Sequence, residues 1–213
     1  MARITGGVFP GPAGDLEYIL NEAGDGSAAG RAAVVCHPHP LFGGTLHTRI
    51  VFHTARALAA MGAPVLRFNF RGVGRSGGAH DRGAGEQEDL RAAMAFMRQR
   101  YPAPLLLAGF SFGATVVARL LAAAAHSEVA QAVLLGLPVD NVRVPQRWAW
   151  SGPTLMISGD HDQYASVAGL EAYYAGLAAP KARRWIAGGD HFLSGHMEEF
   201  REALQTELRR QRR

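Results

Sequence analysis

The stretch LLLAGFSFGATVVARLL, residues 105–121, decides the fold of this chain, because it joins a strand to a helix through one sharp turn. Its first part, LLLAGF, is a continuous apolar run typical of a strand buried on both faces. Its second part has apolar residues every three or four positions and predicts a helix. The turn between them, GFSFG, sets Ser111 between Gly109 and Gly113. Such a turn exposes its central side chain and needs small residues two positions away on either side, so Ser111 is a candidate nucleophile.

The alternation of strand and helix continues through the rest of the chain. Short, mostly apolar runs predict strands at residues 32–36, 65–70, 105–110, 131–136, 154–158 and 183–187. The segments between them predict helices at residues 47–61, 86–100, 112–125, 167–177 and 198–208. This order predicts the α/β class, with a mostly parallel sheet and helices on both of its faces.

The ends of the chain fit this plan less well. Residues 15–20 are expected to add an edge strand, whereas the first dozen residues, rich in glycine and proline, are expected to be loose. No repeat or linker divides the chain, so we expect one domain over residues 1–213.

Composition narrows the classes of partner and compartment. Cys36 is the only cysteine and lies in an apolar run, which excludes an intrachain disulfide and favours a reducing compartment. The N-terminus lacks an apolar stretch of signal length, and no window has the 18 or more apolar residues of a membrane span, so we expect a cytoplasmic protein without membrane contact. The net charge of +4 includes a basic tail, Arg209 to Arg213, but no aromatic residues alternate with it, so no nucleic-acid partner is expected.

Two later strand ends carry the groups that a serine nucleophile requires. A serine hydroxyl needs a base to take its proton, and the base needs an acid to fix its tautomer. The run TLMIS is followed by GDHD, which offers Asp160 and Asp162, and RRWIA is followed by GGDHF, which offers His191. The order serine, aspartate, histidine is the one expected after this type of turn, and either aspartate fits it.

Five motifs together resemble a known family. CHPHPLFGGT (36–45), NFRGVGRSGG (69–78), GFSFG (109–113), GDHD (159–162) and GGDHF (188–192) occur in the order found in the alpha/beta-hydrolase fold. Within that fold the chain is similar to the small dienelactone-hydrolase-like bacterial esterases. The resemblance implies a three-layer structure without a lid domain, with Ser111 as nucleophile, His191 as base and Asp162 as its acid. Asp160 is then free to hydrogen-bond backbone near its turn.

The sequence GVGRSG, residues 72–77, is a literal GxGxxG and invites a dinucleotide interpretation. That fingerprint requires a helix that opens on its last glycine, but the helical period here begins only near Glu86. The next strand, LLLAGF, also ends without the acidic residue that a nicotinamide site needs. The resemblance instead implies a turn that shapes the floor of the active site. Arg71 and Arg75 are expected to pair with carboxylates.

An acyl-transfer site also needs N–H groups that stabilise the oxyanion. Phe112, directly after the nucleophile, is the first expected donor. The second is expected from HPHPLFGG, where Pro38 and Pro40 have no N–H, which leaves His39 or Leu41. In the loop of that family the donor usually follows a histidine-glycine pair. Either histidine-proline pair of this chain could align with that pattern, and we favour Leu41 as the second donor.

The remaining histidines do not predict a metal site. Four of them lie within seventeen positions: His37, His39, His47 and His53. Their spacing matches no common metal-binding motif, so no metal and no cofactor is expected, and the rings of the HPHP segment are expected to be hydrogen-bonded locally. His80 and His196 are expected to face solvent.

The sequence thus predicts a serine hydrolase, a carboxylesterase acting on small or short-chain acyl esters. Thioester, lactone or peptide cleavage would use the same residues, and a noncatalytic binding module on the same fold is the alternative of another class. Residues 136–152 are too few for a lid domain, and Trp148 and Trp150 in that segment are expected either to line the pocket or to pack on the surface.

Overall fold

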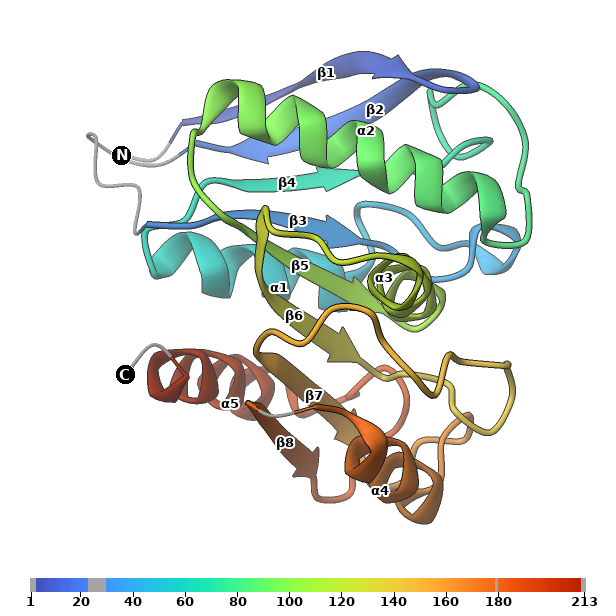
Figure 1. Cartoon of the computed structure of the whole chain (residues 1–213), viewed down its shortest axis with the longest axis vertical. Helices are drawn as coiled ribbons and strands as arrows, with labels where there is room; N and C mark the ends of the chain where they lie inside the picture. Colours follow the sequence, from blue (N-terminus) through green and yellow to red (C-terminus); the bar gives the residue numbers. More distant parts are fainter. Residues whose placement is uncertain (1–2, 23–29, 179, 212–213) are drawn as a thin grey trace.

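An eight-stranded sheet forms the centre of the molecule in the computed structural model, which describes residues 3–22, 30–178 and 180–211 (Figure 1). The strands are β1 (Ile4–Gly11), β2 (Gly14–Asn21), β3 (Ala32–Cys36), β4 (Val65–Phe68), β5 (Leu105–Phe110), β6 (Val129–Leu135), β7 (Thr154–Gly159) and β8 (Lys181–Ile186). Their order across the sheet is β1-β2-β4-β3-β5-β6-β7-β8. The pairs β1/β2 and β2/β4 are antiparallel, and every pair from β4 to β8 is parallel.

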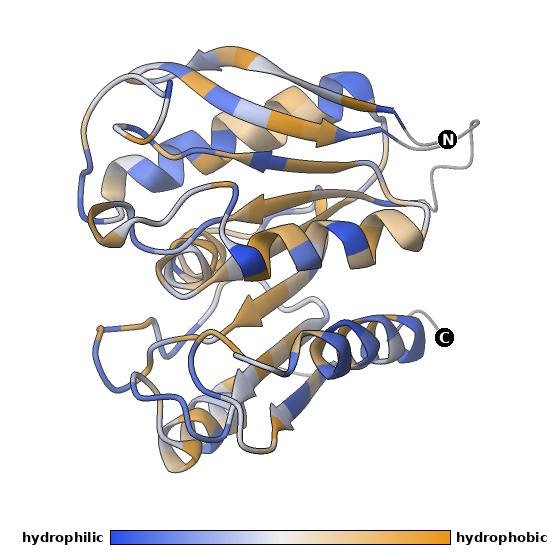
Figure 2. Cartoon of the chain, turned by 180° about the vertical axis from the view of Figure 1, so that it is seen from behind, coloured by the Kyte–Doolittle hydropathy of each residue, from blue (hydrophilic) through white to orange (hydrophobic). Residues whose placement is uncertain are grey.

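Helices cover both faces of this sheet, so the predicted three-layer α/β architecture is confirmed. They are α1 (Arg49–Ala60), α2 (Ala84–Arg100), α3 (Phe112–Ala123), α4 (Val167–Gly176) and α5 (Met197–Arg210), with a short 3-10 turn at Pro40–Phe42. The core has two parts: α2, α3 and α4 pack on one face, and α1 and α5 pack on the other. Coloured by hydropathy, the central strands are mostly apolar and α5 shows a largely hydrophilic surface (Figure 2).

The first residues differ from the sequence prediction. Ile4–Gly11, expected to be loose, is the edge strand β1 and pairs along its whole length with β2. Phe9 anchors it: its ring is buried and stacks on Phe96 at 4.5 Å, close to Tyr18 at 5.9 Å. An edge strand tolerates proline because one side of its backbone needs no partner, which is why Pro10 does not prevent the pairing. Residues 15–20 therefore lie in β2, one strand in from the edge.

The segment after β4 is a turn, as the sequence predicts. Gly72 and Gly74 have φ values of 74° and 57°, the left-handed region that glycine adopts most readily. A Cβ at Gly74 would lie 2.3 Å from a Glu17 carboxylate oxygen, so the loop is packed against β2. Helix α2 begins only at Ala84, and the glycines therefore meet no helix N-terminus that would bind a pyrophosphate.

The arginines of this loop pair as expected. Arg71 Nη2 lies 2.8 Å from the buried Asp89 carboxylate, and Arg75 Nε lies 3.7 Å from Glu17 on the surface. Both therefore support the loop rather than a ligand.

The segment after β6 contains no helix between residues 136 and 153, so no lid domain covers the sheet there. Trp148 donates a hydrogen bond to the Tyr173 hydroxyl, and Trp150 donates one to the Val129 carbonyl. Both tryptophans pack against the core and neither lines the pocket. Among the described residues, no helix combines the length and apolar character that a membrane crossing requires.

Candidate active site

The turn after β5 has the strained geometry that its sequence predicts. Ser111 has φ 55° and ψ −115°, a conformation that non-glycine residues rarely adopt, and it directly precedes α3. A Cβ at Gly109 would lie 2.3 Å from the Gly113 carbonyl oxygen, and one at Gly113 would lie 2.6 Å from the Cys36 carbonyl oxygen. Only glycine fits at both positions, and this close packing holds the serine at the carboxyl end of the sheet.

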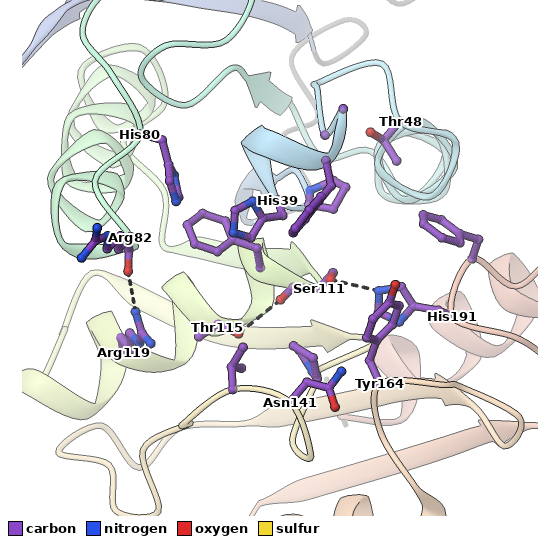
Figure 3. A pocket seen from close by; sticks show the side chains of 18 residues that line it. His39, Thr48, His80, Arg82, Ser111, Thr115, Arg119, Asn141, Tyr164 and His191 are labelled. Atoms are coloured by element: carbon purple, nitrogen blue, oxygen red, sulfur yellow. Dashed lines mark hydrogen bonds between the residues drawn. The ribbon is translucent and has the colours of Figure 1, made fainter.

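Three side chains from three different strand ends meet at this point. His191 Nε2 lies 2.9 Å from Ser111 Oγ (Figure 3). On the other side of the ring, His191 Nδ1 lies 2.8 Å from Asp162 Oδ2. The predicted hydrogen-bond contact between serine and histidine is therefore confirmed. The carboxylate of Asp162 is held in turn, since the Ser158 hydroxyl donates to Oδ2 at 3.1 Å and the Tyr164 N–H donates to Oδ1 at 2.8 Å.

The two aspartates after β7 have different partners. Asp160 Oδ1 accepts a hydrogen bond from the Gly188 N–H at 2.7 Å and ties the β7 turn to the β8 turn. Asp162 alone reaches the histidine ring. The structure thus places the two residues as the family resemblance implies.

The His191 ring occupies a nearly closed aromatic niche. It is 3% exposed, and it packs against Phe110 at 4.9 Å, Tyr164 at 4.6 Å and Phe192 at 5.2 Å between ring centroids. Gly136 at the end of β6 completes the niche, because a Cβ there would lie 3.3 Å from the imidazole. These contacts leave the ring little freedom to rotate away from Ser111.

The loop after β3 contradicts the expected role of Leu41. Its N–H donates to the His39 ring nitrogen Nδ1 at 3.2 Å, and Leu41 is 70% exposed and outside the pocket. The reason is the 3-10 turn at Pro40–Phe42, which directs this amide back to its cap residue, His39. Among the described residues, the His39 N–H has no acceptor, and His39 itself lines the pocket.

His37 holds the same loop from below. Its Nε2 lies 3.0 Å from the Phe70 N and its Nδ1 lies 2.6 Å from the Pro38 carbonyl oxygen. Nε2 accepts the Phe70 N–H and Nδ1 donates to the Pro38 carbonyl, and a histidine ring can do both only when it is neutral. Burial lowers the pKa of His37 from 6.5 to about 4, and the bond to Pro38 offsets only part of this shift. The predicted local hydrogen bonding of the HPHP rings is confirmed for His37 and His39.

The protein is expected to lose stability in acid through His37. In the folded protein the pKa of His37 is about 4, below the ordinary 6.5 of the unfolded chain. The contribution of neutral His37 to the unfolding free energy is therefore fully present above pH 6.5. It is lost as pH falls from 6.5 toward 4, because in this range the unfolded chain takes up a proton and the folded chain does not. Between about pH 7.5 and about pH 4.5 this group should contribute about 2 to 3 kcal/mol to the fall in unfolding free energy. His37→Gln keeps one donor and one acceptor in its amide but does not titrate. In urea denaturation measured at several pH values, this variant should show a fall in unfolding free energy that is smaller by that amount. His47→Gln, on an exposed position, is the matched control, and equal profiles for both variants would contradict this assignment.

An open cavity of about 540 Å³ lies above Ser111. Its walls come from the loop after β3, the loop before α2, the face of α3 and the loops after β6, β7 and β8; they are Pro38, His39, Phe42, Gly43, Gly44, Thr48, His80, Arg82, Ser111, Phe112, Thr115, Arg119, Pro138, Asn141, Val142, Tyr164, His191 and Phe192.

Several of these lining residues carried no recognisable signal in the sequence. The prediction that His80 faces solvent is wrong: its side chain is only 10% exposed, and its Nδ1 lies 2.7 Å from the buried Glu86 carboxylate. Glu86 also accepts the N–H groups of Asp81 and Gly83, so it orders the whole entry to α2. His196 is half-buried, with Nδ1 3.4 Å from Glu199. No cluster of three or more potential metal ligands occurs among the described residues.

Comparison with known proteins identifies the family. A model of the alpha/beta hydrolase domain matches residues 38–209. The uncharacterised protein RP471 of Rickettsia prowazekii (strain Madrid E) is 31% identical to this chain in an alignment that covers 94% of this chain and 87% of that protein.

Two solved structures share both sequence and fold with this chain. XC6422 from Xanthomonas campestris, described as a serine hydrolase without a lid, is 33% identical with a TM-score of 0.83, covering 98% of this chain and 94% of that one. An alpha-beta serine hydrolase homologue from Coxiella burnetii is 32% identical with a TM-score of 0.84, covering 98% of both chains. With the strand order, the sharp turn at Ser111 and the family match in agreement, the chain belongs to the alpha/beta-hydrolase family, in its form without a lid.

Proposed function

We propose that this protein is a serine hydrolase that cleaves small or short-chain carboxylic esters through an acyl-enzyme. The observation that carries the proposal is the unbroken hydrogen-bonded series from Ser111 Oγ through His191 to Asp162, which opens into a cavity at the carboxyl end of the sheet. Similarity to structures described as serine hydrolases supports it.

The proposed reaction has two halves. Ser111 Oγ bonds to the acyl carbon while its proton passes to His191 Nε2, and the charge of Asp162 stabilises the resulting imidazolium. The carbon–oxygen bond to the alcohol then breaks, and His191 returns the proton to the departing oxygen. In the second half, His191 takes a proton from a water molecule while the water oxygen bonds to the acyl carbon. The bond from the acyl carbon to Ser111 Oγ then breaks, His191 returns the proton to Oγ, and the acid is released.

For the oxyanion we propose two backbone donors. Phe112 is the first residue of α3, and its N–H, like the others of a first helical turn, has no acceptor within the helix. The second is the N–H of His39, in place of Leu41, because the Leu41 amide is already bonded to the His39 ring. Both residues border the cavity above Ser111.

Replacing His39 tests this assignment with a matched pair of variants. His39 has φ −56°, which proline adopts without strain, so His39→Pro should remove the N–H while keeping the backbone path. Loss of one oxyanion donor lowers kcat by about 10²- to 10³-fold. His39→Ala, which also lacks the ring but keeps the N–H, should lose much less. Equal kcat for the two variants on p-nitrophenyl butyrate would contradict the role of this amide.

The ester specificity is tested by hydrolysis of p-nitrophenyl acetate, butyrate and octanoate by the wild-type protein. The open cavity and the missing lid favour turnover of the acetate and butyrate over the octanoate. Absence of turnover on all three would contradict the esterase proposal and favour a binding module on the same fold. Thioester, lactone and peptide substrates extend the panel, since the same residues serve each bond.

The cellular location stays a prediction. Cys36 is buried, and burial raises the pKa of its thiol, which agrees with an unreactive core cysteine in a reducing compartment.

A further inference from the structure

The cavity above Ser111 is positively charged. Among its lining residues in the described part of the chain there are two arginines, Arg82 and Arg119, and no aspartate or glutamate. The acidic side chains that follow one another around Arg82 have other partners: Asp81 accepts the Gly85 N–H, Glu86 accepts the N–H groups of Asp81 and Gly83, and Asp89 pairs with Arg71. Among the lining residues themselves, no carboxylate therefore balances the charges of Arg82 and Arg119.

Arg119 is positioned by backbone rather than by a carboxylate. Its Nη1 donates to the Arg82 carbonyl oxygen at 3.0 Å, and its Nη2 lies 3.5 Å from the Arg143 carbonyl oxygen. Among the described residues, no carboxylate lies within 4.0 Å of Arg119 or Arg82, in contrast to Arg71. Gly83 permits this arrangement, since a Cβ there would lie 2.4 Å from Arg119 Nη1. A guanidinium has five N–H donors, so several of those on Arg119 stay available to a ligand.

Arg119 lies on the same helix face as the nucleophile. Ser111, Thr115 and Arg119 are spaced four residues apart, which places them along one side of α3. Ser111 and Arg119 are separated by about 12 Å along the helix axis, and the arginine side chain leans back toward the N-terminus. Figure 3 shows Arg119 and Arg82 on one side of Ser111 and His191 on the other.

This arrangement assigns the two halves of an ester to opposite sides of the cavity. In the proposed reaction the departing alcohol oxygen takes its proton from His191, so the alcohol leaves on the side of His191. The acyl group then extends the other way, past Thr115 toward Arg119 and Arg82. An anionic group at the far end of the acyl chain would meet both arginines.

We propose that the acyl part of the substrate carries an anionic group, in the simplest case a terminal carboxylate, and that Arg119, with Arg82, binds it. The inference rests on the proposed esterase function and names its substrate class: half-esters of dicarboxylic acids or close analogues. Arg119 is a specificity-determining residue in this account, and it takes no part in bond cleavage.

The test compares esters that differ only in charge. The p-nitrophenyl half-esters of adipic and suberic acid are matched against p-nitrophenyl hexanoate and octanoate at low ionic strength. One charge-assisted hydrogen bond to the substrate changes kcat/KM by about ten- to a hundredfold, so the wild-type protein should prefer the half-esters by that factor. Salt of about 0.5 M should reduce the preference, because the arginines are partly solvated.

Variants locate the source of the preference. Arg119→Met should abolish it, measured as the ratio of kcat/KM for the half-ester to kcat/KM for the matched neutral ester, and Arg119→Lys should keep part of it. Arg82→Asn should reduce it and suits the backbone, since Arg82 has φ 51° and asparagine tolerates the left-handed region. Arg209→Met, on the exposed end of α5, removes one charge far from the cavity and should leave the preference unchanged.

A binding measurement separates this proposal from the esterase proposal. Calorimetry with adipic monoamide and with hexanamide needs no turnover, and the monoamide should bind at least about tenfold more tightly to the wild-type protein and lose this advantage in Arg119→Met. If no ester is cleaved but this difference in binding holds, the anion site stands and only the esterase function fails.

Three results would overturn the proposal. The first is equal turnover of charged and neutral esters by the wild-type protein, and the second is a preference that survives in Arg119→Met and Arg82→Asn. The third is a preference for charge on the alcohol side only, measured with p-acetoxybenzoate against p-acetoxybenzamide. If Arg119→Met does not fold, the Arg119→Lys and Arg82→Asn comparisons decide in its place.

Discussion

Ser111→Ala is expected to lower kcat on p-nitrophenyl butyrate by roughly 10⁴- to 10⁶-fold, because it removes the protein atom that bonds to the acyl carbon in the proposed reaction. The residue lies at the carboxyl end of the sheet, with its hydroxyl 2.9 Å from His191 Nε2. Without the hydroxyl, the proposed N–H donors of Phe112 and His39 would still polarise the ester, but only water would be left to attack it. Steady-state hydrolysis measures this loss.

The fold should survive this change. The Ser111 N–H donates to the Leu135 carbonyl oxygen, and that bond does not depend on the side chain. Ser127→Ala, at an exposed serine after α3, is the matched control and should retain wild-type kcat. A Ser111→Ala protein that folds and keeps kcat within about tenfold of wild type would contradict a serine nucleophile, since loss of a nucleophile costs far more than this.

Asp162→Asn should lower kcat by about 10⁴-fold, the second large effect, because it reverses the tautomer of His191. Asp162 Oδ1 accepts the Tyr164 N–H, so the amide oxygen of an asparagine would take that place and its NH₂ group would face the histidine. His191 Nδ1 would then have to accept a proton, and Nε2 would carry one. A protonated Nε2 cannot take the proton of Ser111.

The control for this prediction is the neighbouring aspartate. Asp160→Asn keeps an oxygen that accepts the Gly188 N–H, and residue 160 has no hydrogen bond to His191. We therefore expect kcat to stay within about threefold of wild type. Hydrolysis rates of the two variants, measured side by side with their unfolding curves, distinguish the residues. A large loss in Asp160→Asn with a small one in Asp162→Asn would assign the acid to Asp160 instead.

The fold was largely predictable because its signals are local. Buried parallel strands are short and continuously apolar, and the helices between them have apolar residues every three or four positions, so their order alone indicates the layered sheet. The strand Ile4–Gly11 was not predicted because its glycines and proline argue against a central strand, although an edge strand tolerates them. Its stability comes from packing of Phe9 against rings distant in sequence, which no local pattern shows.

The site was predictable where motif and backbone coincide. Ser111 follows from its turn, and His191 follows from the end of the last strand. The choice between Asp160 and Asp162 needed the family resemblance, since both follow the same strand. The prediction of Leu41 as an oxyanion donor was wrong because its N–H direction is set by a 3-10 turn. That turn is capped by the His39 ring, and the sequence does not show this cap.

The charged side of the cavity lay outside any motif. His80, Arg82 and Arg119 belong to a loop and a helix that meet only in the folded chain, and the helical period around Arg119 indicates a half-buried position without saying what it faces. For the same reason His80 was expected on the surface, although its partner Glu86 lies only a few residues further along the chain.

Ser111 must be an activated nucleophile for the proposed reaction to occur, and covalent labelling by a fluorophosphonate tests this most directly. Trypsin cleavage after Arg100 and Arg119 releases residues 101–119, in which Ser111 is the only serine. We expect one label for each wild-type chain, located by mass spectrometry on Ser111 and absent from Ser111→Ala. An unlabelled wild-type protein, or a label on another residue, would contradict the proposed mechanism.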